Sequence, residues 1–119
     1  MKMQTLKMSA IALVFTAVAA FGQQGTINSA AELRQALATA ESRADHARIA
    51  YYYHHTALVY AGKQAEEEQI ASQWEKQYAN WSKSPNPYRS AKNLAAYYAQ
   101  LSKDAAAHAA EQDKLANNS

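Results

Sequence analysis

The side chains that could bind a metal ion or transfer a proton are four histidines and ten acidic residues. Asp104, His108 and Glu111 have the best local arrangement, because their i, i+4, i+7 spacing places them on one face of a helix. Lys103 and Lys114 lie close by, and a solvated face of surface ion pairs would have the same composition. The trio therefore fits either a metal site or an ordinary charged helix face.

The other three histidines are poorly spaced for a shared metal ion. His46 and His54 are eight residues apart, about 12 Å along a helix. If the chain reverses near residue 85, paired positions have numbers that sum to about 170, so His108 faces residue 62 and not His54. We expect the histidines to come together only across a dimer. The candidate metal ligands are His46, His54, His55, Asp104, His108 and Glu111.

Sequence patterns typical of enzymes are absent. Without cysteine, the chain cannot form a thiolate zinc site, an iron–sulfur cluster, a disulfide or a cysteine nucleophile. It has no Glu-x-x-His pair for a di-iron bundle, no HExxH motif and no glycine-rich phosphate loop. The acidic run 66–68 is typical of a solvated helix face. We therefore expect neither enzymatic activity nor a cofactor.

Aromatic residues are the main candidates for a binding surface, because the chain has eight tyrosines and two tryptophans. Exposed on a helix, these amphipathic rings would suit a protein partner. Packed beside small residues, they would instead cover an alanine-rich helix contact and keep their hydroxyls in water. Both interpretations fit the sequence. The predicted interaction residues are Tyr51, Tyr52, Tyr53, Tyr97, Tyr98, Trp74 and Trp81.

A long helix is expected to position the first group of these side chains. Ser29 and Glu32 have the spacing of a capping box, after an irregular segment over 23–28. From there to about residue 83 the chain has no proline and one glycine, Gly62, so we expect a helix over 29–83. Close approach of an opposing helix would explain Gly62 in a continuous helix. A break near Gly62 would instead give a three-helix bundle.

The second helix is expected after a turn over 84–87. Asn86 followed by Pro87 is a strong signal for an N-cap and a first helical residue. We expect helix over 88–116, a frayed tail over 117–119 and no strands. The predicted fold class is all-α, a long antiparallel helical hairpin with a coiled-coil-like contact. Residues with 3–4 spacing would form that contact: Ala50, Tyr53, Ala57, Tyr60, Gln64, Glu67, Ala71, Trp74, Tyr78 and Trp81 in the first helix, and Ala91, Leu94, Tyr98, Leu101, Ala105, His108, Gln112 and Leu115 in the second.

An internal repeat relates the two helices at an offset of 45 residues. Eleven positions within 49–71 have a similar residue 45 positions later, among them Ile49 with Leu94 and Tyr52 with Tyr97. The matches share one register without gaps. This pattern predicts a duplicated helix that folds back on its copy.

Few large aliphatic residues are available for a core, so aromatic residues must supply much of the buried area. The first expected helix is also longer than the second, which leaves 29–48 as an overhang with an apolar stripe that includes Leu33 and Leu37. Either the overhang frays, or two chains pair as a four-helix bundle that covers it. We expect a homodimer.

The first 22 residues have the pattern of a secretory signal peptide. Lys2 and Lys7 form a positive region, an apolar stretch over 8–21 is short for a membrane span, and small residues follow it. We expect cleavage near Gly22, no membrane span afterwards, and a periplasmic or secreted protein. The two lysines account for the net charge of +2, so the rest of the chain has no basic footprint for nucleic acid.

Three stretches resemble a loosely defined group of small exported bacterial proteins, rich in alanine and tyrosine and without assigned activity. They are Asp45-His46 with Ile49-Ala50-x-Tyr52-Tyr53, the linker Ser84-Pro85-Asn86-Pro87-Tyr88-Arg89-Ser90-Ala91, and Leu94-Ala95-Ala96-Tyr97-Tyr98. The resemblance covers about residues 44–116. Where the group often has histidine, this chain has Glu67 and Gln112, which weakens an inference of metal binding.

The expected function is non-enzymatic. We predict an exported helical protein that acts through protein–protein or cell-envelope interaction, as a homodimer or with an envelope partner. A metal-binding helical protein that uses its histidines and carboxylates is one alternative. A periplasmic protein with chaperone-like activity is another.

Overall fold

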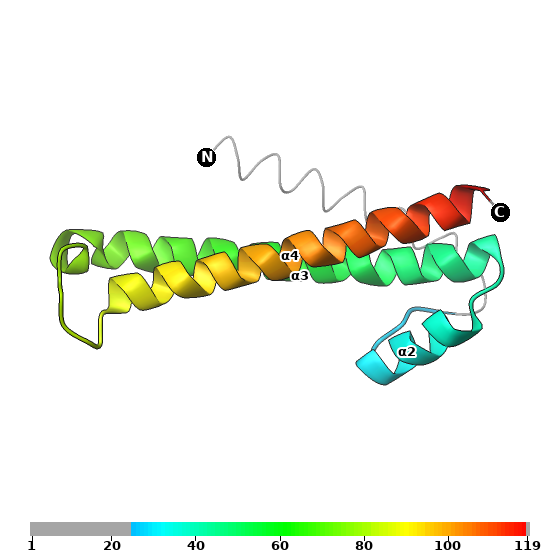
Figure 1. Cartoon of the computed structure of the whole chain (residues 1–119), viewed down its shortest axis with the longest axis horizontal. Helices are drawn as coiled ribbons and strands as arrows, with labels where there is room; N and C mark the ends of the chain where they lie inside the picture. The colour runs from blue at the N-terminus through cyan, green and yellow to red at the C-terminus, as the bar shows by residue number, and fades with distance from the viewer. Residues whose placement is uncertain (1–24, 119) are drawn as a thin grey trace. The chain divides into compact units, whose positions relative to one another are not determined.

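The structure is a computed structural model that describes residues 25–118. Within this range the chain is all-α, as predicted, and has no strand. Figure 1 shows α2 (Ala30–Thr39), α3 (Arg43–Tyr78) and α4 (Pro87–Asn118), of which α3 and α4 form a helical hairpin. The predicted signal peptide over 1–22 and residue 119 of the predicted tail lie outside the described residues. The expectation of a frayed tail is wrong for residues 117–118, which belong to α4.

The described chain divides into two compact units. Unit 1 comprises residues 25–56 and 105–118, and unit 2 comprises residues 57–104. Each unit contains one stretch of α3 packed against one stretch of α4. Unit 1 also contains α2, and unit 2 contains the loop over 79–86 in which the chain reverses direction (Figure 1).

The expectation of one helix over 29–83 is wrong at its N-terminal end. The chain leaves helical geometry at Ala40, whose backbone is extended (φ −67°, ψ 127°), and α3 begins three residues later. A capping box begins α3: Ser42 Oγ accepts a hydrogen bond from the Asp45 N–H (3.1 Å), and Asp45 Oδ2 accepts from the N–H groups of Glu41 and Ser42 (3.0 Å each). A strong helix start therefore divides a segment that has no helix-breaking residue.

The predicted capping box at the start of α2 is confirmed. Ser29 Oγ accepts a hydrogen bond from the Glu32 N–H at 3.1 Å. The Glu32 carboxylate in turn accepts from the Asn28 N–H at 3.0 Å. Residues 29–48 are therefore neither an overhang nor a frayed end, because α2 folds back onto α3 and buries Ile27, Ala36 and Ile49 together.

Gly62 does not interrupt α3, so the alternative break near Gly62 is wrong, although the described chain does contain three helices. Close helix approach does not explain this glycine either, since a Cβ atom built on it meets no atom within 4 Å. The register accounts for the error: Ser102 Oγ donates to the Ala57 carbonyl at 2.8 Å, so paired positions have numbers that sum to about 160 rather than about 170. The reversal is shifted toward the N-terminus because α3 ends at Tyr78 and not near residue 83.

Asn86 caps the start of α4 and also forms hydrogen bonds with the chain at and after the end of α3. As predicted, its Oδ1 accepts a hydrogen bond from the Arg89 N–H at 3.1 Å, and Pro87 is the first residue of α4. Its Nδ2 group donates to the carbonyls of Tyr78 and Trp81, each at 3.0 Å. The first bond satisfies the carbonyl of the last residue of α3, and the second holds the loop that follows it.

The helix contact consists mostly of small residues, and we call it the seam. On α3, the predicted stripe is buried or half-buried from Ala50 to Ala71. On α4, four of the eight predicted stripe positions are wrong. In each case the residue one position later, an alanine or a serine, occupies the contact in place of the predicted leucine or histidine. The observed α4 seam is Ala91, Ala95, Tyr98, Ser102, Ala105, Ala109, Gln112 and Ala116. Small side chains allow the helix backbones to approach, so the larger residues lie at the edge.

Among the described helices, none combines the length and apolarity needed to cross a membrane.

Candidate functional site

All four histidines lie in unit 1, and two of them join α3 to α4 through hydrogen bonds. The His46 Nδ1–H donates to Gln112 Oε1 at 2.8 Å. The His54 Nε2–H donates to Asp113 Oδ2, also at 2.8 Å. The latter pair is partly exposed, at 38% and 46% of the two side chains, so solvent screens its charge. These histidines therefore act as polar links at the edge of the seam.

The prediction that His108 faces residue 62 is wrong. Its ring stacks on Tyr53, with centroids 4.9 Å apart and planes 29° from parallel. The corrected helix register accounts for this contact, because 53 and 108 sum to about 160. His108 therefore lies beside the α3 residue that precedes His54, and not one or more helical turns away.

The six candidate metal ligands do not assemble. Within residues 25–118, no group of three or more histidine, aspartate or glutamate side chains is placed to hold an ion. In the predicted trio, His108 Nδ1 lies 3.9 Å from Glu111 Oε2, whereas Asp104 accepts a hydrogen bond from Gln100 at 2.8 Å. His55 stacks on Tyr51, with ring centroids 6.4 Å apart.

Burial perturbs the ionisation of Tyr53 in unit 1. Burial of the phenol raises its pKa above the ordinary value of 10.0, and the nearby Tyr52 and Glu111 raise it further. Tyr53 also packs against the cluster of Ile27, Ala36 and Ile49 and meets Tyr52 edge to face at 5.7 Å. This ring is part of the packing between elements and is not free for a partner.

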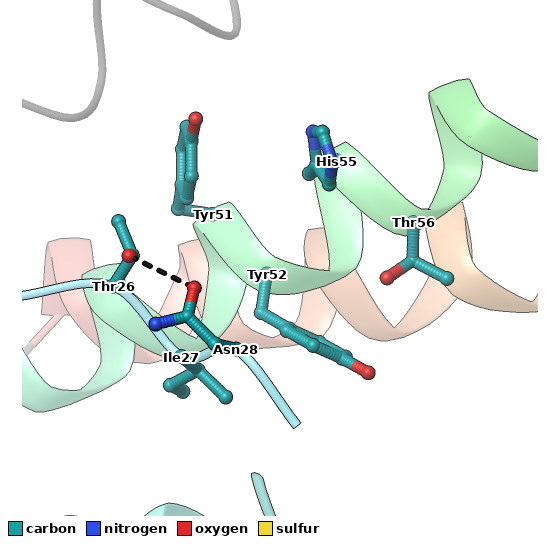
Figure 2. Close-up of a pocket in the computed structure, with 7 residues that line it drawn as sticks. All are labelled: Thr26, Ile27, Asn28, Tyr51, Tyr52, His55 and Thr56. Carbon is teal, nitrogen blue, oxygen red and sulfur yellow. Dashed lines mark hydrogen bonds between the residues drawn. The ribbon is translucent and has the colours of Figure 1, made fainter. Parts of the chain in front are cut away.

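An open cavity lies between the chain that precedes α2 and the outer face of α3 in unit 1. Its volume is about 350 Å³, and Figure 2 shows the residues that line it. They are Thr26, Ile27, Asn28, Tyr51, Tyr52, His55 and Thr56. In Figure 2, Tyr51 and His55 project to the same side of α3, with Thr26 and Asn28 near the base of Tyr51. Sequence analysis singled out the two tyrosines and His55 but none of the polar partners.

The aromatic residues of unit 2 divide into packed and exposed rings. Tyr98 stacks on Tyr60 with centroids 6.0 Å apart, and the Lys63 ammonium lies 5.8 Å from the centre of the Tyr98 ring. Tyr97, by contrast, is 58% exposed. Trp74 and Trp81 are also exposed, although each makes an edge-to-face contact with Tyr78. The predicted interaction residues that remain available in unit 2 are therefore Tyr97, Trp74 and Trp81.

Large apolar residues of unit 2 gather on one side of its helix pair. We call this set, Val59, Ile70, Leu94 and Tyr97, the apolar side of unit 2. Each member directly precedes a seam residue, so each is rotated by about 100° from the seam in the same sense. In antiparallel helices this rotation leads to the same side of the pair. The members come from both helices, and all are exposed.

Comparison of equivalent positions in the internal repeat shows that a covering helix is present in unit 1 but not in the described part of unit 2. Ile49 of unit 1 also directly precedes a seam residue, and it is completely buried beneath α2 (0% exposed). Its equivalent in the repeat, Leu94 of unit 2, is 43% exposed. Tyr52 is half-buried, whereas its equivalent Tyr97 is exposed. Unit 1 therefore has a helix over this side, and the described part of unit 2 has none.

No protein-family model matches this chain, and no curated protein or solved structure is significantly similar to it.

Proposed function

We propose that this chain is an exported, non-enzymatic helical protein that acts through protein–protein contact, and that its partner is a second copy of itself. The observation that carries the proposal is the difference between Ile49 and Leu94. They occupy equivalent positions of the repeat, but α2 buries the first and nothing in the described chain covers the second. The apolar side of unit 2 thus has the chemistry of a helix contact without its helix.

The charges beside the apolar side favour a second copy. Lys63 and Glu66 also directly precede seam positions, so they lie on the same side of unit 2, and both are exposed. A surface that carries both signs is complementary to itself when two copies meet across a two-fold axis. A second copy would also cover apolar residues of both partners in one step, which suits a chain with few large buried side chains.

Export is the second part of the proposal, and it follows from the pattern of residues 1–22. An exported chain meets other proteins of the cell envelope, so such a protein is the alternative occupant of the apolar side. The chemistry required of that occupant is the same, namely an amphipathic helix with an apolar stripe.

Disulfide trapping tests the contact directly, because the chain has no cysteine of its own. Ile70→Cys and Leu94→Cys each place one thiol on the apolar side of unit 2. Near the centre of a two-fold contact, a residue lies beside its own copy, so at least one variant should form a disulfide-linked dimer rapidly on mild oxidation.

Ala96→Cys is the matched control, since Ala96 is exposed on α4 but does not precede a seam residue. It should crosslink slowly. Equal, slow crosslinking of all three variants would reject the contact between copies. A crosslink to a different protein in intact cells, with no dimer, would assign the apolar side to an envelope partner instead.

A further inference from the structure

One wall of the cavity of unit 1 is the segment before α2, and packing and a hydrogen bond hold this segment in place. Ile27 is buried in the cluster with Ala36 and Ile49, which anchors the chain before α2 to α3. The Asn28 N–H is held by the Glu32 carboxylate at 3.0 Å, next to the N-cap of α2. The residues opposite α3 are therefore pre-positioned, and binding would not have to order them.

The opposite wall presents aromatic faces. The rings of Tyr51 and His55 are nearly parallel, with planes 16° apart and centroids separated by 6.4 Å, and both project from the same side of α3 (Figure 2). Tyr52 adds a third ring to the lining. A ligand with at least one apolar face can pack against such rings.

The rim of the cavity is polar but carries no lysine, arginine or carboxylate. The Thr26 hydroxyl donates to Asn28 Oδ1 at 3.3 Å, which orients the amide and leaves its Nδ2 group as a donor (Figure 2). The Thr26 oxygen remains an acceptor, and Thr56 supplies a second hydroxyl. Because the lining has no fixed charge, it offers little to an ion and favours a neutral ligand.

We infer that this cavity binds a neutral sugar ring. A pyranose combines an apolar C–H face, which packs on aromatic rings, with an edge of hydroxyl groups that both donate and accept hydrogen bonds. The cavity pairs these two features in the same arrangement, with rings on α3 and hydroxyl and amide groups on the segment before α2. A volume of about 350 Å³ is at the small end of ligand sites, which suits one or two rings.

Titration of the purified protein with N,N′-diacetylchitobiose, a neutral disaccharide, tests this inference. Two-dimensional NMR should show saturable shifts of the backbone amides at 26–28 and 51–56. The charged sugar galacturonate should bind more weakly, because no cation lines the cavity. Removal of a ring by Tyr51→Ala should weaken binding about tenfold.

Thr26→Val provides a second variant, which keeps the shape of an exposed side chain and removes one hydroxyl. It should also weaken binding without loss of helix content. Tyr97→Ala removes an exposed tyrosine of unit 2 and should leave the affinity unchanged. No saturable shift, a preference for galacturonate, or equal losses from Tyr97→Ala and Tyr51→Ala would overturn the inference. All residues that line the cavity belong to unit 1, and the proposed dimer contact lies on unit 2. Leu94→Glu should therefore leave sugar binding intact.

Discussion

At the scale of single residues, Asn86 has the clearest structural role. It is buried and caps α4 through its oxygen, and its nitrogen donates to one carbonyl at the end of α3 and to one in the loop after it. Asn86→Ala should therefore lower the free energy of unfolding by about 1–3 kcal/mol, because it removes the cap and leaves buried polar groups unpaired. Urea unfolding followed by circular dichroism measures this change. The exposed Lys83→Ala is the control, and an equal effect of the two variants would contradict this role.

Tyr53 makes stability depend on pH in the alkaline range. Burial and neighbouring negative charge raise its pKa in the folded state above the unfolded value of 10.0, so the folded state keeps the phenolic proton longer. The associated stabilisation is present below pH 10.0 and is lost as pH rises through the folded-state pKa.

Tyr53→Phe should therefore give a shallower fall in unfolding free energy above pH 10.0 than the wild-type protein. Urea unfolding at a series of pH values measures the slope. Tyr97→Phe is the matched control, because it removes the same hydroxyl group from an exposed tyrosine. If Tyr53→Phe and the wild-type protein decline in parallel, the stated cause is wrong.

At the scale of elements, the seam requires small residues. Ala109 is completely buried (0% exposed) at the α3–α4 contact of unit 1. Ala109→Leu should lower the free energy of unfolding by about 1–3 kcal/mol, since the added methyl groups overfill a close helix contact. Ala106→Leu places the same side chain on the exposed face of the same helix and should change stability by no more than about 0.5 kcal/mol. Urea unfolding of both variants compares them.

Gly62 tests the corrected helix register. It is exposed within α3, and an added Cβ atom meets nothing within 4 Å. Gly62→Ala should therefore raise the free energy of unfolding by about 0.5–1 kcal/mol, because alanine is the better helix former. A loss of stability in thermal or urea unfolding would mean that another helix approaches this position closely.

Gly25→Ala is the contrasting variant, because the φ of +71° at Gly25 disfavours a side chain. This substitution should lower the free energy of unfolding.

Elements with strong local signals could be predicted from the sequence. Ser29, Asn86 and Pro87 mark helix starts through their own chemistry, and all three positions are confirmed. The capping pair Ser42 and Asp45 carries the same kind of local signal for the start of α3, although residues 29–61 contain no glycine or proline.

Features that depend on contacts far apart in the chain could not be predicted. The α4 seam is shifted by one position because close backbone approach selects Ala95 and Ala109 over larger neighbours, which periodicity alone cannot decide. The cavity of unit 1 joins Thr26 and Asn28 to Tyr51, and it exists only because the chain turns back after α2. The Ser42–Asp45 cap marks where α3 begins, but it does not indicate which face of α3 the preceding chain packs against.

At the scale of the whole molecule, the described residues bury few large apolar side chains and leave several others exposed to solvent. Within residues 25–118, the buried hydrophobic residues are isoleucine at two positions and otherwise alanine. Several larger apolar side chains are exposed, among them Val59, Ile70 and Leu94. This distribution supports the proposed contact between two copies of the chain.

The molar mass in solution tests this claim most directly. Light scattering coupled to size exclusion should give the wild-type protein twice the mass of one chain. Leu94→Glu places a charge on the apolar side of unit 2 and should reduce the mass to that of one chain, with helix content preserved. Ala96→Glu on the same helix should remain dimeric. A wild-type protein that stays a single chain at every concentration would contradict the account.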